Sequence, residues 1–492
     1  MPSTNIDINF DNSYSRLPEN FYEKINPESV KNPKLIVFNN NLGNKLGIEN
    51  TGSKETLSKV FSGNLLPDGS EPIALAYAGH QFGNFVPQLG DGRALLIGEI
   101  INQEQERFDI QLKGSGKTKF SRQGDGKSAL GPVIREYILS EAMHALNVPT
   151  TRALAAVTTG EDVFRETRLP GGILTRVAKS HVRVGTFEYF MARKDLKNLK
   201  ILADYVLERL YPQALESKNP YLNMLQTIAE KQAQLIAKWM QIGFIHGVMN
   251  TDNTSIAVET IDYGPCAFMD EYNPQTVYSS IDHHGRYAFA NQAQIAHWNL
   301  ACLSGCLIPL VDKNEEKSKA EINKVLESFS KNVNDEISRK MTQKIGLDKP
   351  DQEGLELLRA LLKLMHESKT DYTLTFRSLS DVAQGKAKEF ISFFDTKDSI
   401  SDWITAWEKL LSKQGKDRSE TADSISSINP LYIPRNHLVE RAIQSGVSDQ
   451  DFSYMLKLSK ILEEPFTRQD IEPEFHLPPK EEEKVHQTFC GT

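Results

Sequence analysis

The sequence predicts an α+β fold in which a β-rich N-terminal part is followed by a larger helical part. Short apolar runs separated by polar turns recur between Ala74 and Gln111, as is typical of strands. After about residue 195 the apolar residues recur every three or four positions, which indicates amphipathic helices. We therefore divide the chain into a polar N-terminal extension, a β-rich lobe, a helical lobe and a C-terminal segment, over residues 1–70, 71–190, 191–430 and 431–492.

Composition places the chain among globular proteins. Its 492 residues exceed one minimal domain, and 39% apolar with 25% charged residues is typical of a soluble protein. A net charge of −8 argues against nonspecific nucleic-acid binding. The apolar run 299–311 is shorter than the roughly 20 residues that span a bilayer, and the N-terminus has no signal or transit pattern. We expect a cytoplasmic protein without nucleic-acid or membrane partners, and take a monomer as the default while the oligomeric state stays open.

The elements of the β-rich lobe follow from local patterns. Two strands, RALLIGEI and RFDIQL, lead into a glycine-studded loop from Lys113 to Gly131. Pro132 then opens a helix with i, i+4 apolar spacing, which ends at Asn147. Further strands are expected in RALAAVT, DVFRE and GGILTRVAKSHVRVGTFEYF.

In the helical lobe, MLQTIAEKQAQLIAKWMQIGF has the spacing of an amphipathic helix and leads directly into HGVMNTDN, residues 246–253. The charged, Pro-rich end of the chain is expected to be a solvated tail.

The octapeptide HGVMNTDN has the length and both ends of a protein-kinase catalytic loop, H-R-D-x-x-x-x-N. Val248 occupies the position at which a kinase has its catalytic Asp. Asn253 is followed nine residues later by Asp262, in a D-Y-G sequence of the kinase D-F-G form. With a tight hairpin between them, these two oxygen donors could share one Mg²⁺ ion. The order of long helix, H-G, Asn and D-x-G is far more specific than any single piece.

Three further pieces occur in kinase order. Gly90 and Gly92 form G-x-G between two strands, where bare backbone can approach phosphate, although an ordinary hairpin turn gives the same pattern. Lys113 closes a strand, as the phosphate-binding lysine of kinases does, and a surface lysine is the alternative. Glu136 lies in the first turns of the following helix, where it could hold Lys113 toward phosphate or simply face solvent.

Arg176 and Arg183 are seven residues apart and would clamp extended phosphates if they share a face, although surface arginines in salt bridges fit the same spacing. Together with the order of strands and helices, these pieces give the layout of a two-lobed, protein-kinase-like fold with a C-terminal extension. A layout alone does not establish a function.

The sequence resembles the selenoprotein O family over most of its length. The resemblance is carried by YAGHQFGNFVPQLGDGRALLIGE, DIQLKGSGKTKFSRQGDGKSALGPVIREYILSEAMHAL, GGILTRVAKSHVRVGTFEYF, GFIHGVMNTDN, IDYGPCAFMDEYNP, DHHGRYAFANQ and NPLYIPRNHLVERAI. It implies a protein-kinase-like fold that moves AMP, not phosphate, from ATP to Ser, Thr or Tyr hydroxyls of proteins, with the enzyme itself as one candidate substrate. It also implies an inverted nucleotide, so that the α-phosphorus is attacked and pyrophosphate leaves.

The resemblance also implies roles for individual residues. Asp252 would be the proton acceptor, Asn253 and Asp262 would bind Mg²⁺ or Mn²⁺, and Glu136 would position Lys113 on the phosphates. The residues expected to line the ATP site are Gly90, Gly92, Arg93, Lys113, Asp125, Gly126, Arg176, Arg183 and Asp262. The residues themselves support one of these roles, because a hydroxyl nucleophile needs a carboxylate near the metal and Asp252 is the nearest one to Val248 in the loop.

Four cysteines are too few for a disulfide framework in a chain of this length. Cys302 and Cys306 have helical spacing in an apolar segment and are expected to be core thiols, with a metal pair as the alternative. Relatives often carry a redox-active Cys or selenocysteine near the C-terminus, and Cys490 matches that position. The segment after DEYNP lacks the usual partner, so a Cys266–Cys490 bridge, with a role in redox stress, is a hypothesis.

Two other functions compete with AMP transfer. An ordinary kinase would need an Asp at position 248, where Val248 stands. A nucleotide-binding scaffold without catalysis would have no need of the complete set Lys113, Glu136, Asn253 and Asp262. UTP as an alternative donor, with UMP transfer, stays open because nothing in the sequence specifies the base.

Overall fold

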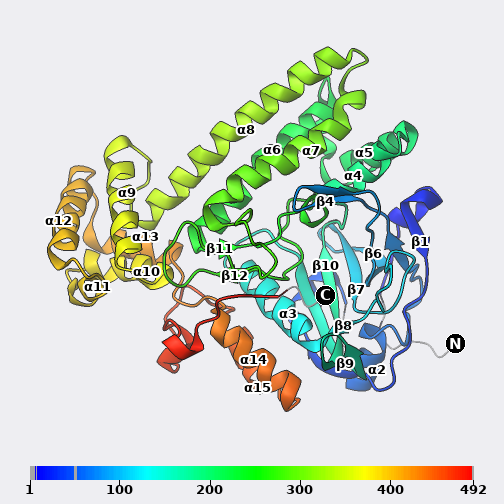
Figure 1. The fold of residues 1–492 in the computed structure, drawn as a ribbon, viewed down its shortest axis with the longest axis horizontal. Helices are drawn as coiled ribbons and strands as arrows, with labels where there is room; N and C mark the ends of the chain where they lie inside the picture. Colours follow the sequence, from blue (N-terminus) through cyan, green and yellow to red (C-terminus); the bar gives the residue numbers. More distant parts are fainter. Residues whose placement is uncertain (1–5, 7, 49–52, 490–492) are drawn as a thin grey trace.

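The computed structural model describes residues 6, 8–48 and 53–489. It is a mixed fold of helices and antiparallel strands, in which most strands precede most helices, as predicted (Figure 1).

One large sheet occupies the N-terminal half. Its strands follow the spatial order β1-β3-β6-β7-β10-β9-β2, with β8 paired to β10, and every pairing is antiparallel. The sheet strands are β1 (Tyr22–Lys24), β2 (Lys34–Phe38), β3 (Ile73–Leu75), β6 (Ala94–Ile101), β7 (Arg107–Lys113), β8 (Ser128–Ala129), β9 (Arg152–Phe164) and β10 (Arg168–Ala178). Two small two-stranded sheets stand apart: β4 (Gly79–Gln81) with β5 (Asn84–Val86), and β11 (Phe244–Ile245) with β12 (Ala267–Phe268).

Described segments within the first 70 residues belong to this sheet or pack on it. They supply both of its edge strands, β1 and β2, and the helices α1 (Asn40–Leu46) and α2 (Lys54–Phe61). The sequence predicts only a polar extension here, because its apolar pieces are too short to be recognised as strands. The sheet's own edges recruit these short strands through backbone pairing.

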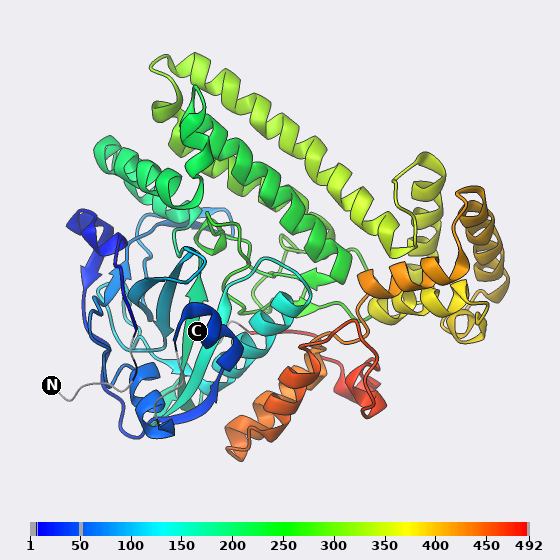
Figure 2. The same ribbon diagram turned by 180° about the vertical axis from the view of Figure 1, so that it is seen from behind.

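The two faces of the sheet are covered by different helices. Along β7, Phe108, Ile110 and Leu112 pack with apolar residues of α1 and α2. On the opposite face, α3 (Leu130–Ala145) packs on β9 and β10 and is covered in turn by α14 (Asn436–Ser448) and α15 (Ser453–Ile461). Seen from behind, the blue N-terminal helices lie in front of the sheet and α3 beyond it (Figure 2). The polar residues of β7, Asp109, Gln111 and Lys113, alternate with its apolar ones and so point away from α1 and α2.

The rest of the chain is mainly helical. Its remaining helices are α4 (Val184–Ala192), α5 (Leu196–Leu210), α6 (Pro220–Ile242), α7 (Gln292–Val311), α8 (Glu315–Lys344), α9 (Gln352–Glu367), α10 (Tyr372–Ala383), α11 (Lys388–Ser392), α12 (Lys397–Lys413) and α13 (Arg418–Ile428). The long helices α6, α7 and α8 pack on one another, while α9 to α13 form a separate group with its own core (Figure 1). Asn219 caps the N-terminus of α6, and Gly243, with φ +73°, ends it in the left-handed conformation.

Within the described residues, one segment, Phe289–Val311, is long and apolar enough to cross a membrane by length and composition alone. It contains α7, which packs on α4, α6 and α8 and buries Leu300, Leu303 and Leu307. This is the packing of a core helix, and such helices pass the same test.

Two local predictions are wrong, and a third is confirmed only in part. RALAAVT and DVFRE form one strand, β9, because Gly160 at φ +68° lets the chain continue past an irregularity in the pairing. GTFEYF is helical, within α4, where its aromatic residues pack into the core, so tertiary packing overrides their β propensity. Between Asn253 and Asp262 there is no hairpin; the segment makes only single bridges, from Ser255 to Arg183 and from Thr260 to Thr150.

The C-terminal tail is not solvated throughout. The red segment in Figure 1 runs back past α14 toward α3. Thr488 is buried; its amide donates to the Tyr278 carbonyl at 2.8 Å and its hydroxyl to the Pro265 carbonyl at 2.5 Å. Lys484 pairs with Glu271 at 2.9 Å. The tail therefore covers the segment that follows Asp262, which its polar composition did not predict.

Candidate active site

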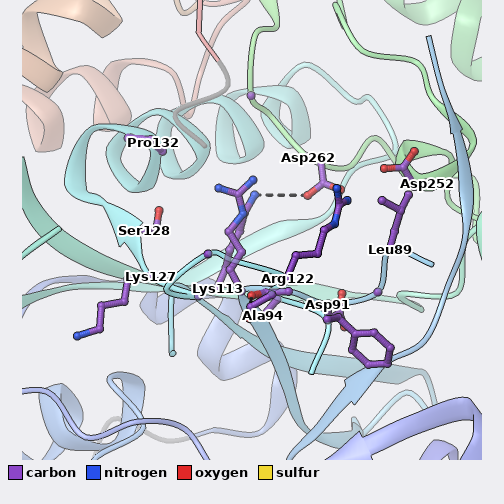
Figure 3. A pocket seen from close by; sticks show the side chains of 18 of the residues that line it. Leu89, Asp91, Ala94, Lys113, Arg122, Lys127, Ser128, Pro132, Asp252 and Asp262 are labelled. Carbon is purple, nitrogen blue, oxygen red and sulfur yellow. Dashed lines mark hydrogen bonds and ion pairs between the residues drawn. The ribbon is translucent and has the colours of Figure 1, made fainter. Parts of the chain in front are cut away.

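A cavity of about 700 Å³ lies between the sheet and the loops that follow α6. It brings together twelve of the residues singled out in the sequence, from segments far apart in the chain: Gly90, Gly92, Arg93, Lys113, Asp125, Gly126, Glu136, Arg176, Arg183, Asp252, Asn253 and Asp262. Figure 3 shows Asp252 and Asp262 on loops at one side of this cavity and Lys113 rising from the strands below.

Strand register sets the cationic wall of the cavity. Arg176 of β10 lies directly opposite Gln111 of β7, and Gln111 shares its face with Lys113, two residues on. The Arg176 Nη2 atom donates to Gln111 Oε1 at 2.7 Å. Lys113 Nζ donates to Glu136 Oε2 of α3 at 2.6 Å. The predicted pairing of Glu136 with Lys113 is therefore present, and neither side chain is a solvated surface residue.

Asp262 is the point at which three cations converge. Its Oδ1 atom lies 2.6 Å from Arg176 Nη1 and 3.4 Å from Lys113 Nζ, and its Oδ2 atom bonds to Arg183 Nη1. Burial alone would raise the pKa of Asp262, but Arg183, Arg176 and Lys113 hold that pKa well below its usual range. Asp262 also has φ +63°, an uncommon left-handed conformation for a residue other than glycine. The two arginines thus share a target even though Arg183 precedes helix α4 instead of lying on a strand.

Asp252 is the other carboxylate of the cavity. It lies in a short 3-10 turn, η4 (Thr251–Asn253), and is 7% exposed. Gln81 Nε2 donates to its Oδ2 atom at 3.1 Å, whereas its Oδ1 atom is buried without a hydrogen-bond partner among the described residues. Burial raises the pKa of Asp252 to about 6, against the lowering effects of Gln81 and Arg183. A carboxylate with one unused oxygen and a pKa near neutrality has the properties of a general base.

The strand pair β4–β5 positions the loop that carries Asp252. The His80 amide donates to Thr251 Oγ1 at 2.6 Å, and Thr251 in turn donates to Glu188 of α4 at 2.5 Å. The Phe82 amide donates to Asn250 Oδ1 at 3.0 Å. The sequence did not predict Gln81 or this support, because YAGHQFGN is informative only as part of the family resemblance. No local pattern shows that β4 will meet a loop 171 residues away.

The donor set suits a divalent cation. Asn253 lines the cavity and donates its amide NH₂ to the Val248 carbonyl at 3.0 Å, which leaves its side-chain oxygen available as an acceptor. Asp262 and Asp252 add carboxylate groups to the lining. Oxygen donors of this kind are the ligands that Mg²⁺ and Mn²⁺ prefer.

The glycine-rich loop forms the outer wall of the cavity. At Gly126, φ is +69° and a Cβ atom would lie 2.0 Å from the Gly116 carbonyl oxygen, so no other residue fits. Asp125 is paired with Arg165 at 2.9 Å and is therefore tied to the wall. Arg122 and Arg165 also line the cavity and were not predicted, while Lys127 points away from Asp262 toward Glu161 (Figure 3).

The three cysteines among the described residues lie outside this cavity. Cys266 is buried, and Cys490 lies outside the described residues, so the predicted bridge is not tested. Cys306 is buried, as expected of a core thiol. Cys302 is half-buried, and its sulfur lies within 4.8 Å of ligand atoms of His80 and Glu188, neighbours that the sequence did not reveal.

Comparison with known proteins decides the family. The sequence profile of the family described as "Protein adenylyltransferase SelO" matches residues 4–463. The chain belongs to this family. It is 52% identical over 483 residues to the "Protein nucleotidyltransferase YdiU" of Maridesulfovibrio salexigens, covering 98% of both chains. The proteins of the same name from Rhizobium etli and Agrobacterium fabrum are 51% and 50% identical, over 98% and 99% of this chain and 97% and 100% of theirs.

Membership of the SelO family confirms the predicted resemblance and the predicted enzyme class, a nucleotidyltransferase. A nucleotide substrate and protein targets agree with these names. The names give no metal, donor nucleotide or target residue.

Proposed function

We propose that this protein transfers AMP from ATP to Ser, Thr or Tyr hydroxyls of proteins, its own included, and releases pyrophosphate. The observation that carries the proposal is the position of Asp252. Asp252 lines the cavity that holds the cation cluster around Asp262, whereas the kinase position is occupied by the buried, apolar Val248. A hydroxyl nucleophile thus has a base beside the cations, but not at the position where a kinase places it.

We also propose that the fold is a two-lobed, protein-kinase-like one, with lobes at 71–190 and 191–430, flanked by residues 1–70 and 431–492. Support comes from a strand lysine paired with a helix glutamate, Lys113 with Glu136, and from the loop of Asn253 and that of Asp262 opposite them. Kinases assemble their phosphate site from the same kinds of element in the same chain order.

The proposed roles follow from charge and reach. Lys113, Arg176 and Arg183 neutralise the phosphates, and Glu136 keeps Lys113 extended toward them. Gly90, Gly92, Arg93, Asp125 and Gly126 line the remainder of the nucleotide site.

Asn253 and Asp262 hold Mg²⁺ or Mn²⁺, which when bound supplies positive charge to the phosphate oxygens.

In the reaction, the substrate hydroxyl oxygen forms a bond to the α-phosphorus while the bond from that phosphorus to the bridging oxygen breaks. The hydroxyl proton passes to Asp252, and the electron pair of the broken bond leaves with pyrophosphate. This requires the inverted nucleotide orientation, with the α-phosphate nearest Asp252. The enclosed position of Asp252, at 7% exposure, excludes most water from the base.

The redox hypothesis remains a proposal with one new support. Thr488, two residues before Cys490 in the sequence, bonds to the carbonyl of Pro265, the neighbour of Cys266. The described part of the tail thus reaches the neighbour of Cys266, and a role in redox stress would require Cys490 to reach Cys266 itself. Mass mapping of the oxidised protein tests it: a linked Cys266–Cys490 peptide pair is expected, and both thiols free would refute the pairing.

The decisive experiment compares ATP labelled at the α-phosphate with ATP labelled at the γ-phosphate. Acceptor proteins, or this protein alone, should gain label from α-labelled ATP and none from γ-labelled ATP. Label from the γ-position would establish the rival kinase reaction, and no label with intact nucleotide binding would establish the rival scaffold. Parallel reactions with UTP determine whether UMP is also transferred. We further propose a cytoplasmic location and a monomer, which fractionation and light scattering test.

A further inference from the structure

A second cavity lies apart from the candidate active site. Its volume is about 580 Å³, within the range of small-molecule sites, and none of its lining residues lines the first cavity. It is bounded by α6 and α8 on one side, which run side by side in Figure 1, and by the ends of β7, β10 and α3 on the other. The proposed AMP transfer makes no use of it.

The charge of this cavity is strongly one-sided. Seven basic side chains line it, against the two acidic ones of Glu106 and Glu259. Some of the bases are neutralised: Arg152 by Glu141, Arg339 by Glu336, and Lys45 by Glu106 at 3.6 Å. The basic lining residues are Lys45, Arg152, Lys179, Lys231, Lys238, Arg339 and Lys340.

Three of these lysines have no counter-charge. Among the described residues, no carboxylate forms an ion pair with Lys231, Lys238 or Lys340. Lys231, Gln234, Leu235 and Lys238 follow one another at i, i+3, i+4 and i+7 on α6 and so share the face that lines the cavity.

The uncompensated charges destabilise one another. Burial, followed by the charges of Lys340 and Arg339, lowers the pKa of Lys238 to about 8. Burial and Lys179 likewise lower the pKa of Lys231. The nearby Glu259 compensates little of this positive charge, because burial raises its pKa to about 7. Clustered cations that are partly desolvated and unpaired are stabilised by a bound anion.

The other walls are apolar. Phe108, Val148, Pro149, Val177 and Leu235 line the cavity between the basic groups. An inorganic ion would leave these walls without a contact, whereas a phosphate group attached to an apolar or aromatic body would use both kinds of wall.

We propose that this cavity is a second binding site, specific for a small organic phosphate whose phosphate group is held by Lys238 and Lys340, with Lys231 on the same face of α6. The site shares a wall with the segment that leads to Asp262: Val258 and Glu259 line it, and the next residue, Thr260, donates its amide to the Pro149 carbonyl at 2.9 Å. Its existence does not depend on the proposed AMP transfer.

Pyridoxal phosphate is a direct probe, because it joins a phosphate to an aromatic aldehyde. The aldehyde condenses with a deprotonated lysine amine, losing water, and borohydride reduces the imine to a stable secondary amine. Peptide mapping by mass spectrometry then reads each lysine separately, so that Lys113 in the first cavity is scored independently of Lys238. The experiment uses the full chain and needs no transfer activity.

We expect pyridoxal phosphate to modify Lys238 at least about tenfold faster than pyridoxal, which lacks the phosphate, and inorganic phosphate to protect it. The double variant Lys231→Gln, Lys340→Gln should lose this preference. The matched control Lys324→Gln, Lys331→Gln removes the same charge from exposed positions of α8 and should keep it. Equal labelling by pyridoxal, or no protection by phosphate, in the wild-type protein would overturn the proposal, whether or not the variants fold.

Discussion

Replacing Asp252 by Asn tests the proposed base most directly. The two side chains have nearly the same shape, so Gln81 keeps a hydrogen-bond partner at 3.1 Å while the cavity loses its proton acceptor. General-base catalysis contributes about 10²–10⁴ in rate, or about 2.7–5.4 kcal/mol of transition-state stabilisation. We expect α-label incorporation by Asp252→Asn to fall by that factor, with nucleotide affinity little changed.

The same residue predicts a pH profile. The pKa of Asp252 is raised from 3.8 to about 6, so the wild-type rate should rise with pH through about 6 and level off above about 7. At pH 5 only about a tenth of the molecules would have the ionised base. Initial rates of α-label transfer between pH 5 and 8 measure this, and the residual rate of Asp252→Asn should lack the inflection.

With rising pH, the stability of the fold should change in the direction opposite to the rate. Because the folded-state pKa is above the unfolded one, the fold binds more protons than the unfolded chain between about pH 4 and 6, and stability falls as pH rises through that window. A pKa shift of about two units lowers the free energy of unfolding by about 3 kcal/mol at neutral pH. Asp252→Asn should remove much of this cost and raise the denaturant midpoint of the nucleotide-free protein at pH 8.

The control Asp402→Asn, at an exposed position of α12, should change neither the rate nor the midpoint. A rate for Asp252→Asn within about threefold of wild type would refute the assignment of the base, since base catalysis accounts for far more. A wild-type profile that is flat from pH 5 to 8 would do the same.

Three further outcomes are expected. Gln81→Ala removes a hydrogen bond that lowers the pKa of Asp252, so the inflection of the pH–rate profile should move to higher pH; an unchanged inflection would remove Gln81 from the site. Asp262→Asn should abolish transfer and also lower the free energy of unfolding by about 3–5 kcal/mol, because Arg183, Arg176 and Lys113 lose their common counter-charge; denaturant unfolding measures it, and a variant of unchanged stability would contradict that account. Chelation by EDTA should stop α-label transfer and added Mg²⁺ or Mn²⁺ should restore it, whereas transfer that persists in EDTA would exclude the metal role of Asn253 and Asp262.

The sequence by itself determined the order of elements and the identity of the chemical groups. HGVMNTDN and D-Y-G can be recognised in the sequence, because the spacing from Asn253 to Asp262 is set by the chain. The alternation in β7 likewise separates Lys113 and Gln111 from the apolar residues between them. Family membership could be inferred from these runs for the same reason.

Tertiary structure decided how those groups are used. Arg176 and Arg183 meet at Asp262 only because β10 and α4 approach the same loop, and Gln81 reaches Asp252 across 171 residues of chain. The lowered pKa of Asp262 and the raised pKa of Asp252 depend on which charges and how much water surround each carboxylate, and one sequence pattern fits either outcome. Burial and contacts between distant segments are properties of the packed chain. Only the tertiary structure therefore distinguishes the base, Asp252, from the other carboxylate, Asp262.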